Sequence, residues 1–372
     1  MPEAKPLLQP GDPAPWFFAA TPEKLQFKLD TQAGRYVVLS FFQTTASESS
    51  RQFLQGIADQ RTRFEHDNVV FIGVSCDPQD EAHGKLKDLS KDLRFVYDLD
   101  QAASKAYGAA MLDNVPAAQN LYRRMTLVLD ERLRALAVLP LEDHNVAEHL
   151  QQLWNVLDQL PPLPAETLVT ATAPILIVPR VFEPALCREL IAYYEAHGGV
   201  ESGFMREVQG KTVEVFNPEH KRRKDQEILD EPLRQRAMFA VHDRVMPEIQ
   251  RAFQFRPTRI ERHIVACYDA NDGGHFRAHR DNTTKGTAHR RFAVSLNLNT
   301  GDYDGGRLRF PEFGRQQYEA PAGGAVVFSC SLLHEATRVT RGRRYAYLPF
   351  LYDDAAARLR EANQKYLGNR PE

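Results

Sequence analysis

Two histidines and one aspartate have the residue types and the spacing of a metal-ligand set. His279 and Asp281 are separated by a single residue, and His334 follows much later in the chain. Residues i and i+2 of a β-strand point to the same face, so His279 and Asp281 are expected to share one face of a strand. Two imidazoles and one carboxylate leave half of the coordination sphere of Fe(II) open. The pattern therefore predicts an iron site with free positions for small molecules.

The residues around this set strengthen the prediction. A lone His-x-Asp pair is a weak signal, and the alternative is a solvated pair at the surface. Arg344 follows His334 on the same C-terminal stretch, and its planar guanidinium is suited to a bidentate pair with a carboxylate. His275 and His289 flank the motif, and we expect them at the surface or, at most, around the ligands. A metal site beside a carboxylate-binding arginine is the expected arrangement.

Short strands must position these side chains. The segment 291–299 alternates apolar and polar residues, and the segments 305–314 and 321–328 are expected to be further short strands separated by Gly, Asp and Pro turns. This pattern favours a double-stranded β-helix, or jelly roll. Supporting helices are predicted over 184–197, where Pro184 and Gly198 provide start and stop signals, and over 231–253, where Pro247 should kink or divide the helix.

The stretch from about Ile175 to Asp354 resembles the prolyl-4-hydroxylase class of 2-oxoglutarate- and Fe(II)-dependent oxygenases. The matching features are the segment that ends at Tyr268, the His-x-Asp motif, the Gly-Gly-x-Leu-x-Phe-Pro-Glu-Phe-Gly run over 305–314, the distal histidine and Gly342-x-Arg344. The resemblance implies a hydroxylase whose co-substrates are 2-oxoglutarate and O2, with ascorbate as a candidate reductant.

The resemblance also assigns roles to individual residues. It implies that His279, Asp281 and His334 bind Fe(II). Arg344 and Tyr268 would bind the distal carboxylate of 2-oxoglutarate. Asn297 stands where many members carry a tyrosine that touches the co-substrate, and its amide could donate a hydrogen bond there instead.

Basic residues surround the metal motif and suggest an acidic or carboxylate-bearing substrate. They are Arg277, Arg280, Lys285, Arg290 and Arg291. Arg290 matches a basic residue near the substrate entrance in some members of the class, and Arg290 and Arg277 are the candidate substrate residues. The charged run 220–225 is expected to be a solvated loop, with a substrate-facing role as the alternative.

The N-terminal half has the pattern of a mixed α/β domain. Buried strands are predicted over 36–42 and 69–75, helices over 50–66, 81–91, 101–107 and 145–157, and a hairpin over 125–138 that turns at 130–132. A Pro-rich segment follows. We therefore expect a first domain over 1–160, a linker over 161–173 and the oxygenase-like domain over 174–372.

This half resembles a peroxiredoxin or another thioredoxin-like redoxin. The resemblance rests on the segments 11–17, 41–42, 73–77 and 124–130. Peroxiredoxins need a nucleophilic cysteine after the first long strand, and an ungapped alignment places Ser50 there. A serine hydroxyl has no thiolate chemistry. Cys76 ends a buried strand beside Asp77, which disfavours its thiolate. The domain is expected to serve docking, substrate presentation or dimerisation, so a homodimer through this half is a candidate assembly.

Composition limits the remaining classes. The 372 residues suit two domains, and the formal net charge of −2 argues against nucleic acid or membrane as a partner. The start lacks a signal-peptide pattern, and four cysteines form no disulfide framework, so a cytoplasmic location is expected. Three hypotheses stay open: a hydroxylase acting on a protein or a small molecule, a thiol peroxidase with an appended domain, and a scaffold in which both halves are inactive.

Overall fold

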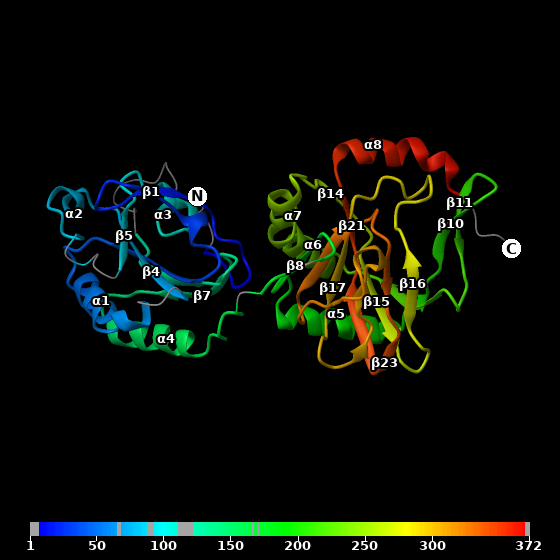
Figure 1. Cartoon of the computed structure of the whole chain (residues 1–372), viewed down its shortest axis with the longest axis horizontal. Coiled ribbons are helices and arrows are strands. Elements are labelled where there is room, and N and C mark those ends of the chain that lie inside the picture. Colours follow the sequence, from blue (N-terminus) through cyan, green and yellow to red (C-terminus); the bar gives the residue numbers. More distant parts are fainter. Residues whose placement is uncertain are drawn as a thin grey trace. The chain divides into compact units, whose positions relative to one another are not determined.

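The structure is a computed structural model that describes residues 7–64, 68–87, 89, 93–110, 122–165, 167–169 and 171–368. The chain divides into two units, Met1–Glu166 and Thr167–Glu372, and the division falls inside the segment expected as a linker. Figure 1 shows the elements of each unit. In the described residues, no helix is both long and apolar enough to cross a membrane.

The first unit is an α/β sandwich with the redoxin fold. Its strands are β1 (Phe18–Ala20), β2 (Gln26–Lys28), β3 (Tyr36–Gln43), β4 (Val69–Ser75), β5 (Arg94–Tyr97), β6 (Met125–Leu129) and β7 (Ala135–Pro140). Its helices are α1 (Glu48–Asp59), α2 (Pro78–Ala82), α3 (Ala102–Ala106) and α4 (Val146–Asp158).

One sheet organises this unit. Its strand order is β2-β1-β5-β4-β3-β6-β7, with β3, β4 and β5 parallel. Alternate side chains of β3 enter two cores: Val37 and Leu39 pack with residues of α3, while Val38 packs with Phe53 of α1 and Leu153 of α4. Figure 1 shows α1 and α4 together on one face of the sheet. Burial of both faces explains why the parallel strands are continuously apolar.

Two predicted helices of this half were wrong in their bounds. The helix expected over 50–66 begins at Glu48, because Ser47 accepts a hydrogen bond from the Ser50 N–H as its N-cap, and it ends at Asp59 before a short 3-10 turn. The helix expected over 81–91 is only α2. Asp77 caps it and Pro78 occupies its first position. Residues 88, 90 and 91 of that prediction lie outside the described residues.

The second unit combines a jelly roll with supporting helices. Its helices are α5 (Pro184–His197), α6 (Glu231–Arg244), α7 (Met246–Phe253) and α8 (Asp354–Asn363). Its strands are β8 (Ile175–Val178), β9 (Val200–Glu201), β10 (Phe204–Val208), β11 (Lys211–Val215), β12 (Lys221–Arg222), β13 (Lys224–Glu227), β14 (Arg259–Glu261), β15 (Ile264–Asp269), β16 (His275–His279), β17 (Phe292–Asn297), β18 (Asp304–Gly305), β19 (Leu308–Arg309), β20 (Gln317–Tyr318), β21 (Ala325–Ser329), β22 (His334–Ala336), β23 (Val339–Arg341), β24 (Arg343–Tyr347) and β25 (Phe350–Tyr352).

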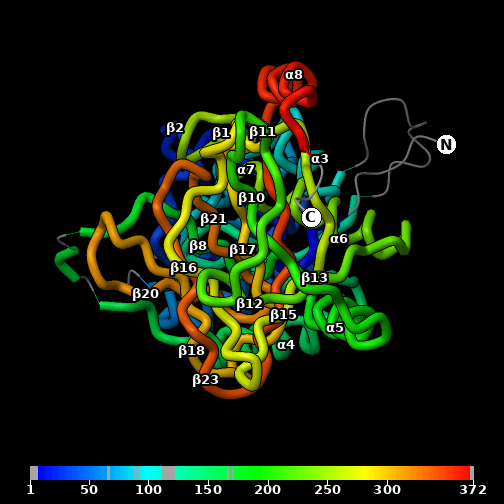
Figure 2. The backbone as a smooth tube through the Cα atoms, turned by 90° about the vertical axis from the view of Figure 1, so that its right-hand side faces the viewer, coloured from blue at the N-terminus to red at the C-terminus, as the bar shows by residue number. Residues whose placement is uncertain are grey.

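Two antiparallel sheets face each other in this unit. The smaller has the order β12-β16-β22-β19-β20, and the larger runs β14-β25-β17-β24-β15-β13-β9, with β21 joining β17 to β8. Figure 2 views the unit with β10, β12 and β16 toward the reader. Tyr268 and Phe350 of the larger sheet share a buried cluster with Phe276 and Leu308 of the smaller one. The space between the sheets is therefore where inward side chains of both meet.

Helices α5, α6 and α7 cover the other face of the larger sheet. Leu190 of α5, Val241 of α6 and Ile249 of α7 pack against that face. The predicted stop signals are confirmed: α5 ends at the left-handed Gly198 (φ 83°), and the 231–253 stretch divides into α6 and α7 beside Pro247.

The expected solvated loop over 220–225 was wrong. This segment forms β12 and the start of β13, and Lys221 and Arg223 are 5% and 6% exposed. Arg223 can be buried because Asp225 lies two residues away and forms an ion pair with it at 2.6 Å. A buried charge needs such a partner. Lys221 and Arg223 thus belong to the protein interior, whereas Lys224 is exposed.

Candidate metal centre and its cavity

The three predicted ligands converge at one edge of the smaller sheet. His279 ends β16 and pairs in register with His334, which begins β22. The Nε2 atom of His279 lies 3.6 Å from Oδ1 of Asp281, and the Nε2 atom of His334 lies 3.4 Å from Oδ2 of the same carboxylate. The three ligand atoms all lie within 4.8 Å of one another. They are close enough to surround a single metal ion.

The strand geometry behind this convergence differs from the prediction. Strand β16 ends at His279, so Asp281 lies in the following turn and not on the same strand face. The register of β16 shifts between Phe276 and His279, and the two rings stack with centroids 3.5 Å apart. A bulge of this kind re-aims side chains beside functional sites. The backbone N–H of Asp281 donates to the Cys330 carbonyl at 3.0 Å, which fixes the turn.

The hydrogen bonds of both histidines prepare them as metal ligands. Nδ1 of His279 faces the Arg277 carbonyl at 2.8 Å, and Nδ1 of His334 faces the Leu332 carbonyl at 3.0 Å. A carbonyl only accepts, so each Nδ1 carries a hydrogen, and the two Nε2 atoms are the ones that face Asp281. Backbone support of this kind orients metal-binding histidines in many sites.

The protonation states fit a divalent cation. Burial lowers the pKa of His334 to about 4, so its imidazole is neutral at pH 7. Burial alone would raise the pKa of Asp281, but the neighbouring His334 and His279 hold it well below its ordinary value. A neutral imidazole and an ionised carboxylate are the forms that bind metal. Two nitrogens and one carboxylate oxygen suit Fe(II) with open positions.

Arg344 lies in the same interior space, and in the described residues it has no acidic partner. It is 2% exposed on β24, and its Nη2 atom donates to Ser295 Oγ at 2.7 Å and to Asn297 Oδ1 at 2.8 Å. Its guanidinium lies 5.2 Å from the centroid of the Tyr268 ring. Within the described part of the chain, no carboxylate pairs with it and its buried Nε has no hydrogen-bond partner. Such a group is poised for an anionic ligand.

The neighbouring Arg343 points to the other face of β24. Its guanidinium pairs with Asp269 at 2.8 Å and with Glu195 at 3.3 Å, and half of its side chain is exposed. Strand alternation thus places one arginine in the interior and the other at the surface.

A cavity of about 700 Å³ joins these groups. It is lined by His279, Asp281, His334, Arg344, Tyr268 and Arg290 among the residues singled out in the sequence. A volume of this size encloses ligands of ordinary small-molecule dimensions. The residues expected to bind metal and co-substrate therefore open into a single space.

Three sequence-based roles need correction. Arg277 lines a separate surface pocket and lies 3.8 Å from Glu219, outside this cavity. Asn297 is buried behind Arg344, and its Nδ2 donates to the Ala320 carbonyl, so it supports the arginine and does not face the co-substrate space. His289 is 2% exposed and pairs with Glu261, contrary to the expected surface position. Asn297 lies two residues after Ser295 on the same face of β17, and both side chains accept a hydrogen bond from the Arg344 guanidinium.

The cavity also contains cations that sequence reasoning missed as site residues. Lys221, Arg223 and Arg262 line it from segments that precede the metal motif in the chain. The 220–225 charge run was a signal for the first two. No sequence pattern indicated that Arg262 would line the cavity. Its backbone lies in the left-handed region (φ 68°), which is not expected for an arginine.

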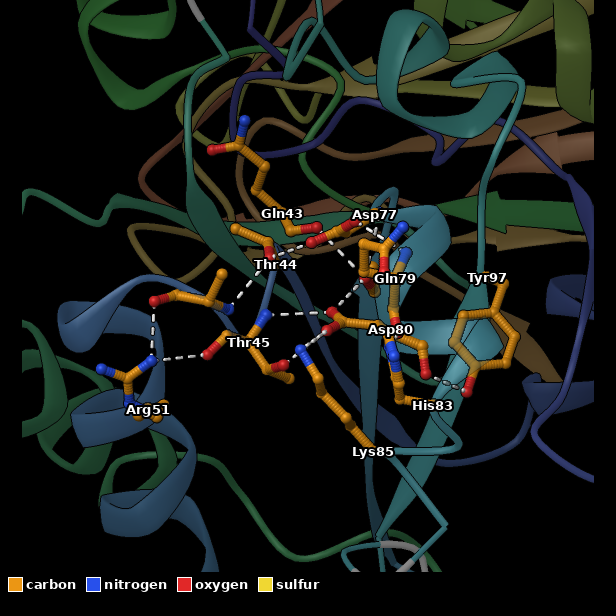
Figure 3. A network of polar contacts seen from close by, with 12 residues as sticks. Gln43, Thr44, Thr45, Arg51, Asp77, Gln79, Asp80, His83, Lys85 and Tyr97 are labelled. Atoms are coloured by element: carbon orange, nitrogen blue, oxygen red, sulfur yellow. Dashed lines mark hydrogen bonds and ion pairs between the residues drawn. The ribbon is translucent and has the colours of Figure 1, made fainter.

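In the redoxin-like half, Ser50 occupies the expected nucleophile position at the start of α1. Its hydroxyl is buried and donates to the Phe42 carbonyl at 2.9 Å, while Arg124 donates to it at 3.3 Å. Figure 3 shows how the preceding loop is held: Thr45 and Asp80 point toward each other, and the Thr45 N–H donates to the buried Asp80 carboxylate at 2.9 Å. The loop has an ordered polar framework but an oxygen where a thiolate would be needed.

Cys76 does not replace the missing nucleophile. It is 8% exposed, and burial, with smaller contributions from Asp98 and Asp77, raises the pKa of its thiol to about 11. The thiol is therefore protonated at pH 7, which opposes nucleophilic chemistry.

Comparison with protein-family models gives one match in each half. Residues 10–135 match the AhpC/TSA family, and residues 263–352 match the 2OG-Fe(II) oxygenase superfamily. The second match spans all three proposed metal ligands and Arg344. The resemblances predicted from the sequence, to a redoxin in the N-terminal half and to an oxygenase in the C-terminal half, are confirmed.

Several known proteins are similar to parts of this chain. A PKHD-type hydroxylase of Synechococcus sp. (strain JA-2-3B'a(2-13)) is 36% identical over 97 residues, which cover 24% of this chain and 42% of that protein. The match thus spans less than half of the relative's length. A prolyl-4-hydroxylase structure from Pseudomonas putida has a TM-score of 0.37 and 20% identity, covering 49% of this chain and 94% of the other. The peroxidoxin BcpB structure from Mycobacterium tuberculosis has a TM-score of 0.34 and 17% identity, covering 40% and 98%.

Proposed function

We propose that this chain is a 2-oxoglutarate- and Fe(II)-dependent dioxygenase that hydroxylates a C–H bond, of a prolyl or another amino-acid residue in a protein or small molecule. The observation that best supports this proposal is that a metal-ligand set and a buried cation line the same cavity. Nε2 of His279, Nε2 of His334 and the Asp281 carboxylate converge at one point. Arg344, a buried cation with no carboxylate partner in the described residues, lines the same space.

The side chains divide the work of this reaction. His279, Asp281 and His334 would hold iron, and Arg344 would pair with the distal carboxylate of 2-oxoglutarate, with Tyr268 beneath its guanidinium. Bound iron, 2-oxoglutarate and O2 would supply the oxidation: one oxygen atom enters the substrate C–H bond, the other enters succinate, and CO2 leaves. The two facing sheets shield the site from bulk water and so protect it from side reactions.

The test is succinate formation. Full-length protein with 2-oxoglutarate, O2 and added Fe(II) should produce succinate, and the product should fall to background when Fe(II) is withheld and a chelator is added. Absence of iron-dependent succinate would favour the inactive scaffold. A thiol peroxidase is opposed by the serine at position 50 and the buried, protonated Cys76.

A further inference from the structure

A second arginine without an acid partner, Arg262, lines the same cavity. Its Nε and Nη2 atoms donate to the Leu348 carbonyl at 3.2 and 3.1 Å, and its guanidinium lies 4.6 Å from the centroid of the Phe350 ring. In the ranges that the structure describes, no hydrogen bond is recorded for its Nη1 atom and no carboxylate forms an ion pair with it. The backbone carbonyl and the ring fix the guanidinium but leave its charge uncompensated.

The neighbouring arginines differ in this respect. Arg223 pairs with Asp225 at 2.6 Å, and Arg290 pairs with Glu261 at 2.8 Å. Arg290 lies over the same Phe350 ring as Arg262, at 4.0 Å. The two guanidinium groups thus share one aromatic support, but only one of them has a carboxylate. Packing on Phe350 alone therefore does not account for an unpaired charge at this position.

Cationic side chains outnumber carboxylates around Asp225 on this wall. Lys221, Arg223 and Arg262 surround Asp225, and Glu214 contributes more weakly at Lys221. Burial, followed by repulsion from Arg223, lowers the pKa of Arg262 to about 10, which still leaves it charged at pH 7. Asp225 and Asp281 attract Arg262 from a distance, but in the described residues no carboxylate forms an ion pair with it. A partly buried guanidinium without a carboxylate in contact is suited to an anionic ligand.

The backbone conformation of Arg262 also indicates a functional position. Arg262 has a φ of 68°, a conformation that is unfavourable for residues with a long side chain. Conformations of this kind persist where the surrounding structure enforces them, and they concentrate at functional sites. Here the left-handed residue connects β14 to β15 and turns its guanidinium into the cavity between the sheets.

We propose that Arg262 binds a carboxylate of the primary substrate while Arg344 holds the co-substrate. The inference rests on the proposed function and names its substrate class: a molecule with a carboxylate near the C–H bond to be hydroxylated. Two kinds of substrate carboxylate fit this description: the terminal carboxylate of a free amino acid or peptide, and the carboxylate of an acidic side chain within a peptide. The cavity of about 700 Å³ has room for such a group beside the small 2-oxoglutarate.

Ligand-observed NMR on the full chain can test this site directly. The protein is loaded with Zn(II) in place of Fe(II) and saturated with 2-oxoglutarate, so that Arg344 is occupied. The probes are N-acetylglycine for a terminal carboxylate, N-acetyl-L-aspartic acid α-amide for a side-chain carboxylate, and N-acetylglycinamide as the uncharged match. At least one carboxylate probe should bind about ten-fold or more tightly than the amide, as expected for one charge-assisted pair.

Three variants separate the role of Arg262 from general electrostatics. Arg262→Gln should weaken the carboxylate probe about ten-fold and leave 2-oxoglutarate binding unchanged, whereas Arg262→Lys should retain part of the affinity. Arg206→Gln removes an equal charge from the rim of the same cavity and should change probe binding little. Melting curves check that each variant is folded.

The outcomes are distinct. Equal binding of acid and amide probes, absence of carboxylate binding, or an unchanged affinity in Arg262→Gln would overturn the proposed subsite. Failure of wild-type protein to bind 2-oxoglutarate would instead contradict the proposed function, and the probe signals would still decide the role of Arg262.

Discussion

The Nη2 atom of Arg344 lies 2.8 Å from Oδ1 of Asn297, so a neutral amide, and not a carboxylate, supports this buried cation. The support orients the guanidinium without neutralising it. The position of the amide therefore bears directly on co-substrate affinity.

Replacing Asn297 should reveal this difference. Asn297→Ala removes one acceptor and should raise the 2-oxoglutarate concentration for half-maximal turnover several-fold, roughly 1 kcal/mol. Asn297→Asp adds a carboxylate beside Arg344 and should raise it much further, because the new charge competes with the co-substrate. Steady-state succinate assays give both values. Wild-type co-substrate affinity in Asn297→Asp would show that Arg344 does not bind 2-oxoglutarate.

The two adjacent arginines of β24 provide a matched pair. Arg344→Gln should raise the 2-oxoglutarate requirement about ten- to a hundred-fold, since a hydrogen bond to a charged group contributes about 1.5–3 kcal/mol. Fe(II) affinity should change little. Arg343→Gln removes a half-exposed side chain that pairs with Asp269 and Glu195, and it should leave co-substrate affinity near the wild-type value. If Arg343→Gln raised the 2-oxoglutarate requirement and Arg344→Gln did not, Arg343 would be the residue of this strand that binds the co-substrate.

The N-terminal half should lack peroxidase activity. Hydrogen peroxide consumption with a dithiol reductant should be no faster for the wild-type protein than for Cys76→Ser, because the Cys76 thiol is protonated at pH 7 and Ser50 cannot form a thiolate. Robust turnover that disappears in Cys76→Ser would make the protein bifunctional and would refute the interpretation of this half as non-catalytic.

Asp225 should make stability depend on acidity. Burial alone would raise its pKa, but Arg223 and Lys221 lower it to about 2 from an ordinary value of 3.8. Because the folded-state pKa is the lower one, the stabilisation is present above pH 4 and is lost as the pH falls toward 2; its size is roughly 2 kcal/mol. Calorimetry should therefore show that the stability difference between wild type and Asp225→Asn shrinks between pH 5 and pH 3. A difference that stays constant would contradict a depressed pKa.

Residue type and spacing predicted the metal centre, because a His-x-Asp motif gains weight when a distal histidine and an arginine follow it. Helix bounds in the second unit were also predictable, since Pro184, Gly198 and Pro247 act through local backbone chemistry. The orientation of Arg277 and the turn position of Asp281 were not. Both depend on a register shift in β16, which has no local sequence signature.

The buried cations were harder still to predict. Arg223 is buried because Asp225 neutralises it, and the guanidinium of the partly buried Arg262 is held by the Leu348 carbonyl and the Phe350 ring. The first cause is an ion pair between residues two apart in the sequence, and the second is a set of tertiary contacts. A charged run considered alone is usually solvated, and that general expectation failed here.

The most direct test of the account is to compare Asp281→Ala with the wild-type chain for both Fe(II) affinity and iron-dependent succinate formation. Asp281 is the only anionic member of the proposed ligand set, and its carboxylate lies 3.4 Å from Nε2 of His334 and 3.6 Å from Nε2 of His279. We predict that the wild-type protein converts 2-oxoglutarate to succinate when Fe(II) is added, and that Asp281→Ala binds Fe(II) far more weakly and forms none above background. Full 2-oxoglutarate turnover in Asp281→Ala would contradict the proposed metal centre.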